Sequence, residues 1–279
     1  MTVLDTVLRR TAGGLTGGVG DSDAGGAVMV RGVTKRFGRG PVILDDVSLD
    51  VAPGEFLCLL GASGCGKSTL LNLMAGLDKP TAGEVATPGH RPSLMFQEPA
   101  LFPWLTAAQN VELALKLRKV AKGERRDEVQ RLLALVRLEG AGDKRPHELS
   151  GGMRQRVALA RALAQDSKVL LMDEPFAALD AITRDALHDE LTRVWEEVGA
   201  TVVFVTHNVR EAVRLGQRVV LMSSRPGRIV REFGVDIAHP RRIESPEVST
   251  LSVTITEHLR TEIRRHAQPV LAGSGAARA

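Results

Sequence analysis

The chain has 279 residues, of which 43% are hydrophobic, so it can bury a substantial core as one compound domain or two small ones. Its formal net charge of +4 is mild and favours an ordinary solvated surface over one that binds nucleic acid or an anionic membrane. The two cysteines, Cys58 and Cys65, are too few and too close in sequence for a disulfide framework, which favours a reducing compartment such as the cytosol.

The first part of the chain does not resemble a folded element or a secretion signal. Residues 11–26 are rich in Gly and have little to bury, which predicts a flexible arm over residues 1–27. The N-terminus lacks an apolar signal core followed by a cleavage site. No stretch reaches the ~20 consecutive apolar residues that a membrane-crossing helix needs. We therefore expect a chain that does not span a membrane by itself.

Short apolar runs typical of β-strands recur from Val28 onward. They cover residues 28–30, 56–60, 169–172, 201–205 and 219–222. Helical periodicity separates the later runs, which predicts an α/β fold with a mainly parallel sheet covered on both faces. Cys58 lies within the second run and is expected to be a buried structural thiol.

The helical periods are clearest in the second half of the chain. A helix is predicted over residues 181–198, where Leu187, Leu191 and Val194 lie on one face, and Gly199 is a typical helix end. Another is expected over about residues 124–138. The ~70 residues between the strands near Met95 and Lys168 are too long for a plain crossover, so an inserted helical subdomain is predicted over about residues 98–165.

A Gly-rich run between a predicted strand and a predicted helix carries the strongest single motif. It matches G-x-x-x-x-G-K-[ST] and is called here the phosphate loop: Gly61, Ala62, Ser63, Gly64, Cys65, Gly66, Lys67, Ser68 and Thr69. The glycines let successive backbone N–H groups surround phosphates, and the helix N-terminus adds positive potential. Lys67 is predicted to reach the β and γ phosphates of ATP, and Ser68 to ligate Mg²⁺. A chance match in a Gly-rich turn is the alternative.

Two adjacent carboxylates follow the apolar run over residues 169–172. Asp173, at the strand's carboxyl end, can hold the Mg²⁺ shell, and Glu174 can polarise a water for in-line attack on the γ phosphate. The alternation of a strand directs the two side chains differently. Taken alone, the pair could instead be an acidic turn at the end of a strand, since such pairs are common.

A second Gly-containing helix start occurs at Ser150, Gly151 and Gly152, ahead of a helix expected over residues 157–164. This too is a candidate anion-binding site. One polypeptide would not need two such sites for one nucleotide unless the second served the nucleotide of another copy. Alone, Ser150 could simply be a helix cap.

The order of these motifs resembles the ABC ATPase family over residues 28 to about 223. The resemblance rests on the phosphate loop, Gln97, the LSGGM run (residues 149–153), Asp173 with Glu174, the ALD run (residues 178–180), and Thr206 with His207. Within that family, the runs FQEPALFPWLT, EPFAALDAITR and RPGRI resemble the branch of nitrate, sulfonate and taurine importers.

The resemblance implies a fold and further roles. The fold would be a P-loop NTPase of the RecA-like type, with an antiparallel β part, over residues 28–240, followed by a C-terminal helix and disordered tail over residues 241–279. Gln97 would sense the Mg²⁺ site and couple it to a permease, and Asp180 would line a dimer interface. His207 would contact the γ phosphate, and Phe37 would stack on adenine where many relatives have Tyr. As lone residues, His207 could be a capped strand end and Phe37 a core residue.

Some positions depart from the family pattern without removing a catalytic group. Met153 replaces a glutamine that is common at the fifth position of the LSGGM run, and Asn208 follows His207 where Asp is usual. In the C-terminal region, Ile255, Leu259 and Ile263 form the one weak helical stripe.

The function implied by the resemblance is that of an ATP-hydrolysing subunit of an ABC importer, peripheral at the cytoplasmic face of the cell membrane. Two copies would hold ATP between residues 61–69 of one and 150–152 of the other. Separate membrane permease subunits would be direct partners, a solute-binding protein an indirect one, and nucleic acid none. The solute would be a small anion such as nitrate, sulfonate or taurine. A heterocyclic precursor is the alternative solute.

Two other classes of protein share parts of this pattern. A non-transport ABC protein of DNA repair or translation would have the same ATP chemistry, but usually carries long coiled-coil inserts or two ATPase cassettes. A module that binds ATP only as a structural ligand would lack Glu174.

The segment over residues 97–105 combines large apolar side chains with two prolines. It either packs inward beneath the helical subdomain or forms a groove for another chain. The resemblance favours docking of a short permease helix, with Phe102 and Trp104 as anchors.

Overall fold

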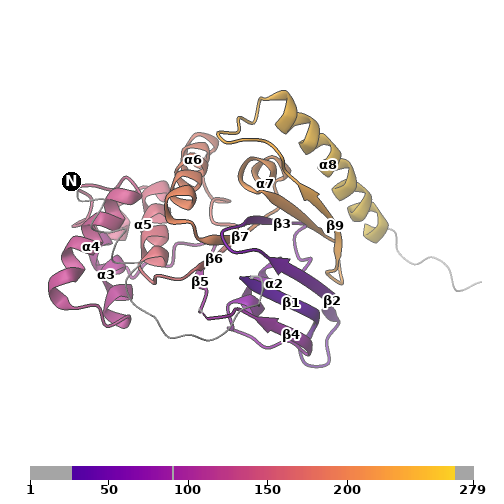
Figure 1. The fold of residues 1–279 in the computed structure, drawn as a ribbon, viewed down its shortest axis with the longest axis horizontal. Helices are drawn as coiled ribbons and strands as arrows, with labels where there is room; N and C mark the ends of the chain where they lie inside the picture. Colours follow the sequence, from indigo (N-terminus) through magenta and orange to yellow (C-terminus); the bar gives the residue numbers. More distant parts are fainter. Residues whose placement is uncertain (1–26, 90, 268–279) are drawn as a thin grey trace, which may run out of the picture.

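The computed structural model describes residues 27–89 and 91–267 (Figure 1). The predicted flexible arm, apart from Ala27, and the predicted disordered tail beyond Ala267 lie outside the described residues. The elements are, in chain order, β1 (Val28–Arg36), β2 (Val42–Val51), β3 (Phe56–Leu60), α2 (Lys67–Met74), β4 (Ala82–Ala86), β5 (Ser93–Met95), α3 (Ala107–Leu117), α4 (Lys122–Leu135), η1 (Pro146–Glu148), α5 (Gly151–Leu163), β6 (Val169–Asp173), α6 (Ala181–Val198), β7 (Thr201–Thr206), α7 (Val209–Leu215), β8 (Arg218–Met222), β9 (Ile229–Gly234) and α8 (Pro246–Ala267).

The larger sheet has six strands in the order β5-β6-β7-β3-β8-β9. All neighbouring pairs are parallel except β8 and β9, which are antiparallel. Every residue of β3 and β7 is buried, because helices cover both faces of a parallel sheet and leave no strand face for polar side chains. The mainly parallel core predicted from the apolar runs is therefore confirmed.

The smaller sheet is antiparallel, in the order β2-β1-β4. The sequence predicts a strand there only over residues 28–30, whereas β1 extends to Arg36. Strands β1 and β2 alternate between buried and exposed positions, and β4 is largely exposed. Because such strands lack a continuous apolar run, the apolar pattern of the sequence does not reveal where they begin and end.

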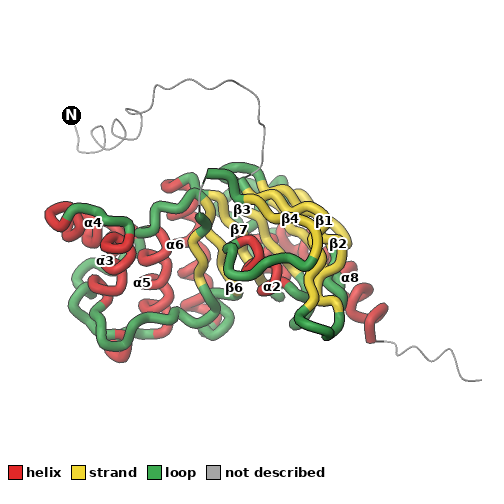
Figure 2. Tube along the Cα trace, turned by 90° about the horizontal axis from the view of Figure 1, so that it is seen from below, coloured by secondary structure: helices red, strands yellow, loops and turns green. Residues whose placement is uncertain are grey.

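Helices α3, α4 and α5 lie between β5 and β6 in the chain, within residues 98–165, and Figure 2 shows them gathered at one end of the molecule. Helix α4 begins two residues before the predicted start at 124 and ends at Leu135 rather than 138. The start predicted for α5 near residue 157 is wrong, because the helix begins at Gly151. The Ser150 hydroxyl accepts a hydrogen bond from the Met153 N–H at 3.2 Å and caps the helix at that point.

The C-terminal half of the chain agrees closely with its periodicity. Helix α6 has the predicted bounds, with Asp180 as its N-cap and Gly199 in the left-handed conformation (φ 66°) at its end. The stripe predicted after residue 240 lies on α8, which packs against α7. Ile255 on that stripe is fully buried, while Ile263 is 43% exposed.

No helix within residues 27–89 and 91–267 is both long and apolar enough to cross a bilayer.

Candidate active site

Seven of the fifteen residues predicted to bind nucleotide line a single cavity of about 400 Å³, together with Asp173 and Glu174. It lies where the phosphate loop leaves β3 and where β6 ends. Its lining residues are Ile43, Ser63, Gly64, Gly66, Lys67, Ser68, Thr69, Gln97, Asp173 and Glu174. The carboxyl ends of parallel strands meet at this edge, which is where ligands of α/β sheets bind.

The backbone of the phosphate loop requires glycine at two of its positions. Gly64 and Gly66 have φ angles of 76° and 102°, a region that side chains with a Cβ atom rarely adopt. A Cβ atom at Gly66 would also lie 2.7 Å from the Cδ2 atom of Leu44. Gly66 is the N-cap of α2 and makes no side-chain cap, which leaves the N–H groups of the first turn available to a ligand.

The charge of Lys67 is held inside this loop. Its Nζ atom donates to the carbonyl oxygens of Gly61 at 2.9 Å and Ala62 at 3.1 Å, and the residue is 4% exposed. The same atom lies 3.8 Å from Oε1 of Glu174. A buried ammonium group beside open backbone N–H groups is suited to bind the oxygens of a polyphosphate.

Ser68 and Asp173 form the candidate metal-binding pair. The Ser68 hydroxyl donates to Oδ1 of Asp173 at 3.0 Å, although the two residues are 105 positions apart. Burial raises the pKa of Asp173 and neighbouring Glu174 adds to that effect, while the Ser68 hydrogen bond opposes it. A hydroxyl and a carboxylate, with the Gln97 side chain on the same cavity, are hard oxygen ligands of the kind Mg²⁺ prefers.

Magnesium at this site would depend on the nucleotide as well as on the protein. No group of three or more His, Cys, Asp and Glu side chains suited to a metal occurs among residues 27–89 and 91–267. An ion held by Ser68 and Asp173 would complete its shell with phosphate oxygens and water, as Mg²⁺ commonly does. Gln97 also contacts the helical region, because its carbonyl oxygen accepts a hydrogen bond from the Gln155 amide on α5 at 3.0 Å.

Glu174 and His207 are directly paired. Nδ1 of His207 lies 2.8 Å from Oε2 of Glu174, at the ends of the adjacent parallel strands β7 and β6. Glu174 has a φ of 44°, a left-handed conformation that is strained for a residue with a Cβ atom. Its N–H donates to the Val205 carbonyl at 3.1 Å and anchors this bend to β7. Strain of this type is concentrated at functional sites.

Six predicted residues outside the phosphate loop do not line the cavity: Phe37, Ser150, Gly151, Gly152, Asp180 and His207, the last of which is paired with Glu174 at its edge. Within the loop, Gly61, Ala62 and Cys65 do not line it either. Ser150 caps α5, and Asp180 caps α6 by accepting from the Thr183 N–H at 2.9 Å, a bond that lowers the pKa of Asp180. The Phe37 ring is 55% exposed, with the Lys35 ammonium 4.7 Å from its centroid. Within one chain, Ser150 and Asp180 therefore cap helices and do not line the phosphate loop cavity.

The structure also brings in residues that the sequence did not single out. Ile43 lines the cavity from β2, and the Arg225 guanidinium donates to the Gly64 carbonyl at 3.4 Å. Arg225 belongs to the RPGRI run, which resembles the importer branch of the family but carries no predicted site residue. Behind Glu174 and His207, a cavity of about 40 Å³ is lined in addition by Ala177, Arg184, Thr206, Asn208 and Glu211.

Comparisons with known proteins agree with this geometry. The family model for ABC transporters matches residues 44–177. The chain is 43% identical over 245 residues to an aliphatic sulfonates import ATP-binding protein of Bacillus licheniformis, covering 84% of this chain and 95% of that protein. It is 45% identical over 223 residues to a nitrate import ATP-binding protein of Synechocystis sp., covering 77% and 83%. A taurine import ATP-binding protein of Roseobacter denitrificans is 46% identical over 202 residues, with 70% and 75% covered.

Solved structures show the same fold. One is the dimeric structure of a post-hydrolysis state of an ATP-binding cassette bound to ADP and Pi. It superimposes with a TM-score of 0.66 at 36% identity and covers 76% of this chain and all of the other.

Proposed function

Because the chain belongs to the ABC transporter ATP-binding family, we propose that this ATPase powers an importer for a small anion such as nitrate, a sulfonate or taurine. The three relatives named above are import proteins for solutes of this chemistry, which supports import over DNA repair or translation. We assign the ATPase domain to residues 28–240, with its helical subdomain over about 98–165 and α8 in the C-terminal region.

The observation that supports this proposal best is the meeting of an ammonium, a hydroxyl–carboxylate pair and the Glu174 carboxylate around one cavity, with the His207 imidazole paired to Glu174. Lys67 would bind the β and γ phosphates, and Ser68 with Asp173 and Gln97 would hold Mg²⁺. When bound, Mg²⁺ would offset negative charge on the phosphate oxygens. Glu174 would orient and polarise the attacking water, while His207 would contact the γ phosphate.

The complete nucleotide site would need a second copy of the chain. Ser150, Gly151, Gly152 and Asp180 lie at the starts of α5 and α6 and do not line the phosphate loop cavity. The N–H groups of a helix start are suited to bind the γ phosphate of a nucleotide held by the partner. The dimeric cassette structure, which contains ADP and Pi, supports such an isologous pair. Phe37, exposed near the start of β2, would stack on adenine.

The segment over residues 97–105 would dock the permease. Phe102 and Trp104 are 38% and 66% exposed, and their ring centroids are 5.5 Å apart. Buried Asn110 holds the segment in place, because its amide contacts the backbone of Phe102, Leu105 and Thr106. An exposed aromatic pair on a fixed backbone suits a protein interface. Through this contact the subunit would be peripheral at the cytoplasmic face of the membrane, with the solute-binding protein acting only indirectly.

Hydrolysis of ATP with Mg²⁺ by the purified full chain tests the central role of Glu174. We expect Glu174→Gln to retain ATP binding and to lose turnover by at least about 100-fold, because an amide cannot act as the base. It should also accumulate an ATP-bound dimer in gel filtration. Glu139→Gln, an exposed loop residue, is the matched control. Normal turnover in the Glu174 variant would overturn the assignment.

A further inference from the structure

A buried histidine on α6 contacts α7 and the segment that carries Glu174. His188 is 2% exposed, and its Nε2 atom lies 2.6 Å from Oε1 of Glu211 on α7. On its other side, the imidazole packs against the ring of Phe176 with centroids 5.6 Å apart. Phe176 follows Glu174 by two residues, so His188 touches the segment of the proposed catalytic carboxylate as well as α7.

The second carboxylate oxygen of Glu211 connects to the segment that carries His207. Oε2 accepts a hydrogen bond from the Thr206 hydroxyl, and Thr206 directly precedes His207. The same hydroxyl accepts from the N–H of Asn208, the residue that follows His207, at 2.9 Å. The backbone on both sides of His207 is therefore tied to one side chain, Thr206, and through Glu211 to His188.

We propose that His188, Glu211 and Thr206, named here the positioning cluster, hold His207 and Glu174 at hydrogen-bond distance for hydrolysis. The inference rests on the proposed function. The cluster reaches the pair directly, because Thr206, Glu211, Glu174 and His207 line the same cavity of about 40 Å³. That cavity is large enough for an ordered water, which needs about 10–15 Å³.

The chemistry of the cluster favours positioning over simple core packing. All three side chains are at least nine-tenths buried, and burying polar or charged groups is costly where apolar residues would serve. Nδ1 of His188 makes no hydrogen bond within the described chain, and its nearest carboxylate oxygen, Oδ1 of Asp185, is 3.8 Å away. An unsatisfied buried polar atom is uncommon in a residue kept only for packing.

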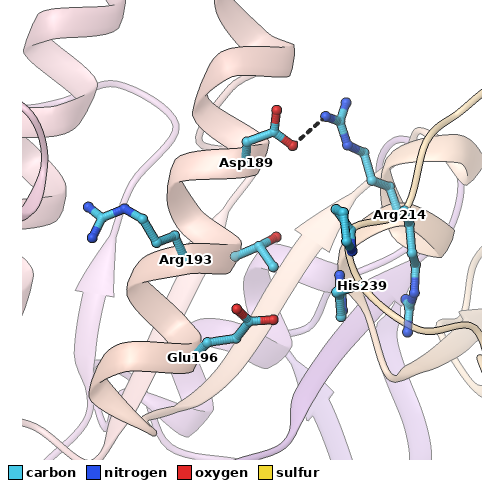
Figure 3. A pocket seen from close by; sticks show the side chains of 8 residues that line it. Asp189, Arg193, Glu196, Arg214 and His239 are labelled. Atoms are coloured by element: carbon cyan, nitrogen blue, oxygen red, sulfur yellow. Dashed lines mark hydrogen bonds and ion pairs between the residues drawn. The ribbon is translucent and has the colours of Figure 1, made fainter.

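Two members of the cluster, His188 and Glu211, lie on α6 and α7, and ion pairs join these two helices. Arg214 of α7 pairs with Asp185 and Asp189 of α6, at 2.8 and 2.7 Å, and Figure 3 shows the second of these pairs. Asp189 and Arg214 border a hollow between α6, α7 and the segment after β9. Sites supported on rigid elements keep their geometry within the small tolerance that catalysis requires.

Steady-state hydrolysis by His188→Leu and Thr206→Val tests the inference. Leu removes the hydrogen bond to Glu211, and Val removes only the hydroxyl of Thr206. We expect kcat to fall by roughly 10- to 100-fold in both, because small displacements of reacting groups have effects of this size. The KM for ATP and the equilibrium affinity for ATP should change by less than about twofold, since the phosphate loop is untouched. His188→Gln should recover much of kcat, because its amide can donate to Glu211.

Val194→Ala is the control for general destabilisation, since Val194 is a 2% exposed residue on the same helix, six positions after His188. It should lower Tm and leave kcat near that of the wild type. The inference would be overturned if His188→Leu and Thr206→Val kept normal kcat, or if kcat followed Tm in all variants. Should His188→Leu fail to fold, the nearly isosteric Thr206→Val decides. Absence of hydrolysis in the wild type would instead overturn the proposed function, and with it the inference.

Discussion

We expect nucleotide affinity to depend more on Lys67 than on any other side chain. Lys67 is buried, lies among the carbonyl oxygens of its own loop and places one positive charge in the cavity. We expect Lys67→Ala to weaken ATP binding by roughly 10- to 100-fold, since hydrogen bonds with charged partners contribute about 1.5–3 kcal/mol. Equilibrium binding of ATP with Mg²⁺ measures the loss. Lys116→Ala, which removes a half-exposed lysine on α3, should bind normally, and equal affinity of the two variants would contradict the assignment.

The start of α5 combines a structural and a proposed catalytic role in Ser150. As an N-cap, Ser150 contributes about 1 kcal/mol to stability, which Ser150→Ala should remove with a corresponding fall in Tm. Because it would also bind the partner's γ phosphate, this variant should lose most of its hydrolysis while retaining ATP binding at its own phosphate loop.

Thr106 offers a closely matched control for that prediction. Its hydroxyl caps α3 by accepting from the Gln109 N–H at 3.2 Å, the same distance as in the Ser150 cap. Thr106→Ala should lower Tm to a similar extent and leave hydrolysis by the free subunit intact. If both variants lost hydrolysis equally, Ser150 would be only a helix cap.

The symmetry of the proposed dimer predicts that two inactive variants restore each other. In a mixed dimer of Lys67→Ala and Ser150→Ala, both defects fall in one composite site and leave the other intact. If the sites act independently, an equimolar mixture should recover roughly a quarter of wild-type turnover, since half of the dimers are mixed and each has one of two sites. Hydrolysis is measured before and after mixing. Recovery no greater than the mean of the separate variants would show that each nucleotide site lies within one chain.

Coupling to a membrane permease belongs to the assembled transporter. Trp104→Ser should abolish co-purification with the permease and change hydrolysis by the free subunit by less than about twofold, because exposed substitutions alter stability little. Leu117→Ser, at a 77% exposed position on α3, is the control and should leave permease binding unchanged. Normal permease binding by Trp104→Ser, or its unfolding, would place this segment in the core.

Features carried by neighbouring residues could be predicted from the sequence alone. The phosphate loop contains its glycines, Lys67 and the helix start within nine consecutive positions, so its chemistry is complete locally. Strand β3 is a continuous apolar run, and α6 has its cap, its periodic face and its terminal glycine within one short stretch. These signals depend on the backbone periods of 2 and 3.6 residues, which short-range patterns express directly.

Contacts between distant segments depended on the order of the strands and on side-chain packing. Ser68 meets Asp173 across 105 positions, and His207 meets Glu174 only because β6 and β7 are adjacent in the sheet. The contact of His188 with Glu211 has no local sequence signal at all, since it requires α6 and α7 to pack together. A local pattern specifies which face of an element is apolar, but not which element covers it. Only the folded chain brings these polar groups within hydrogen-bond distance.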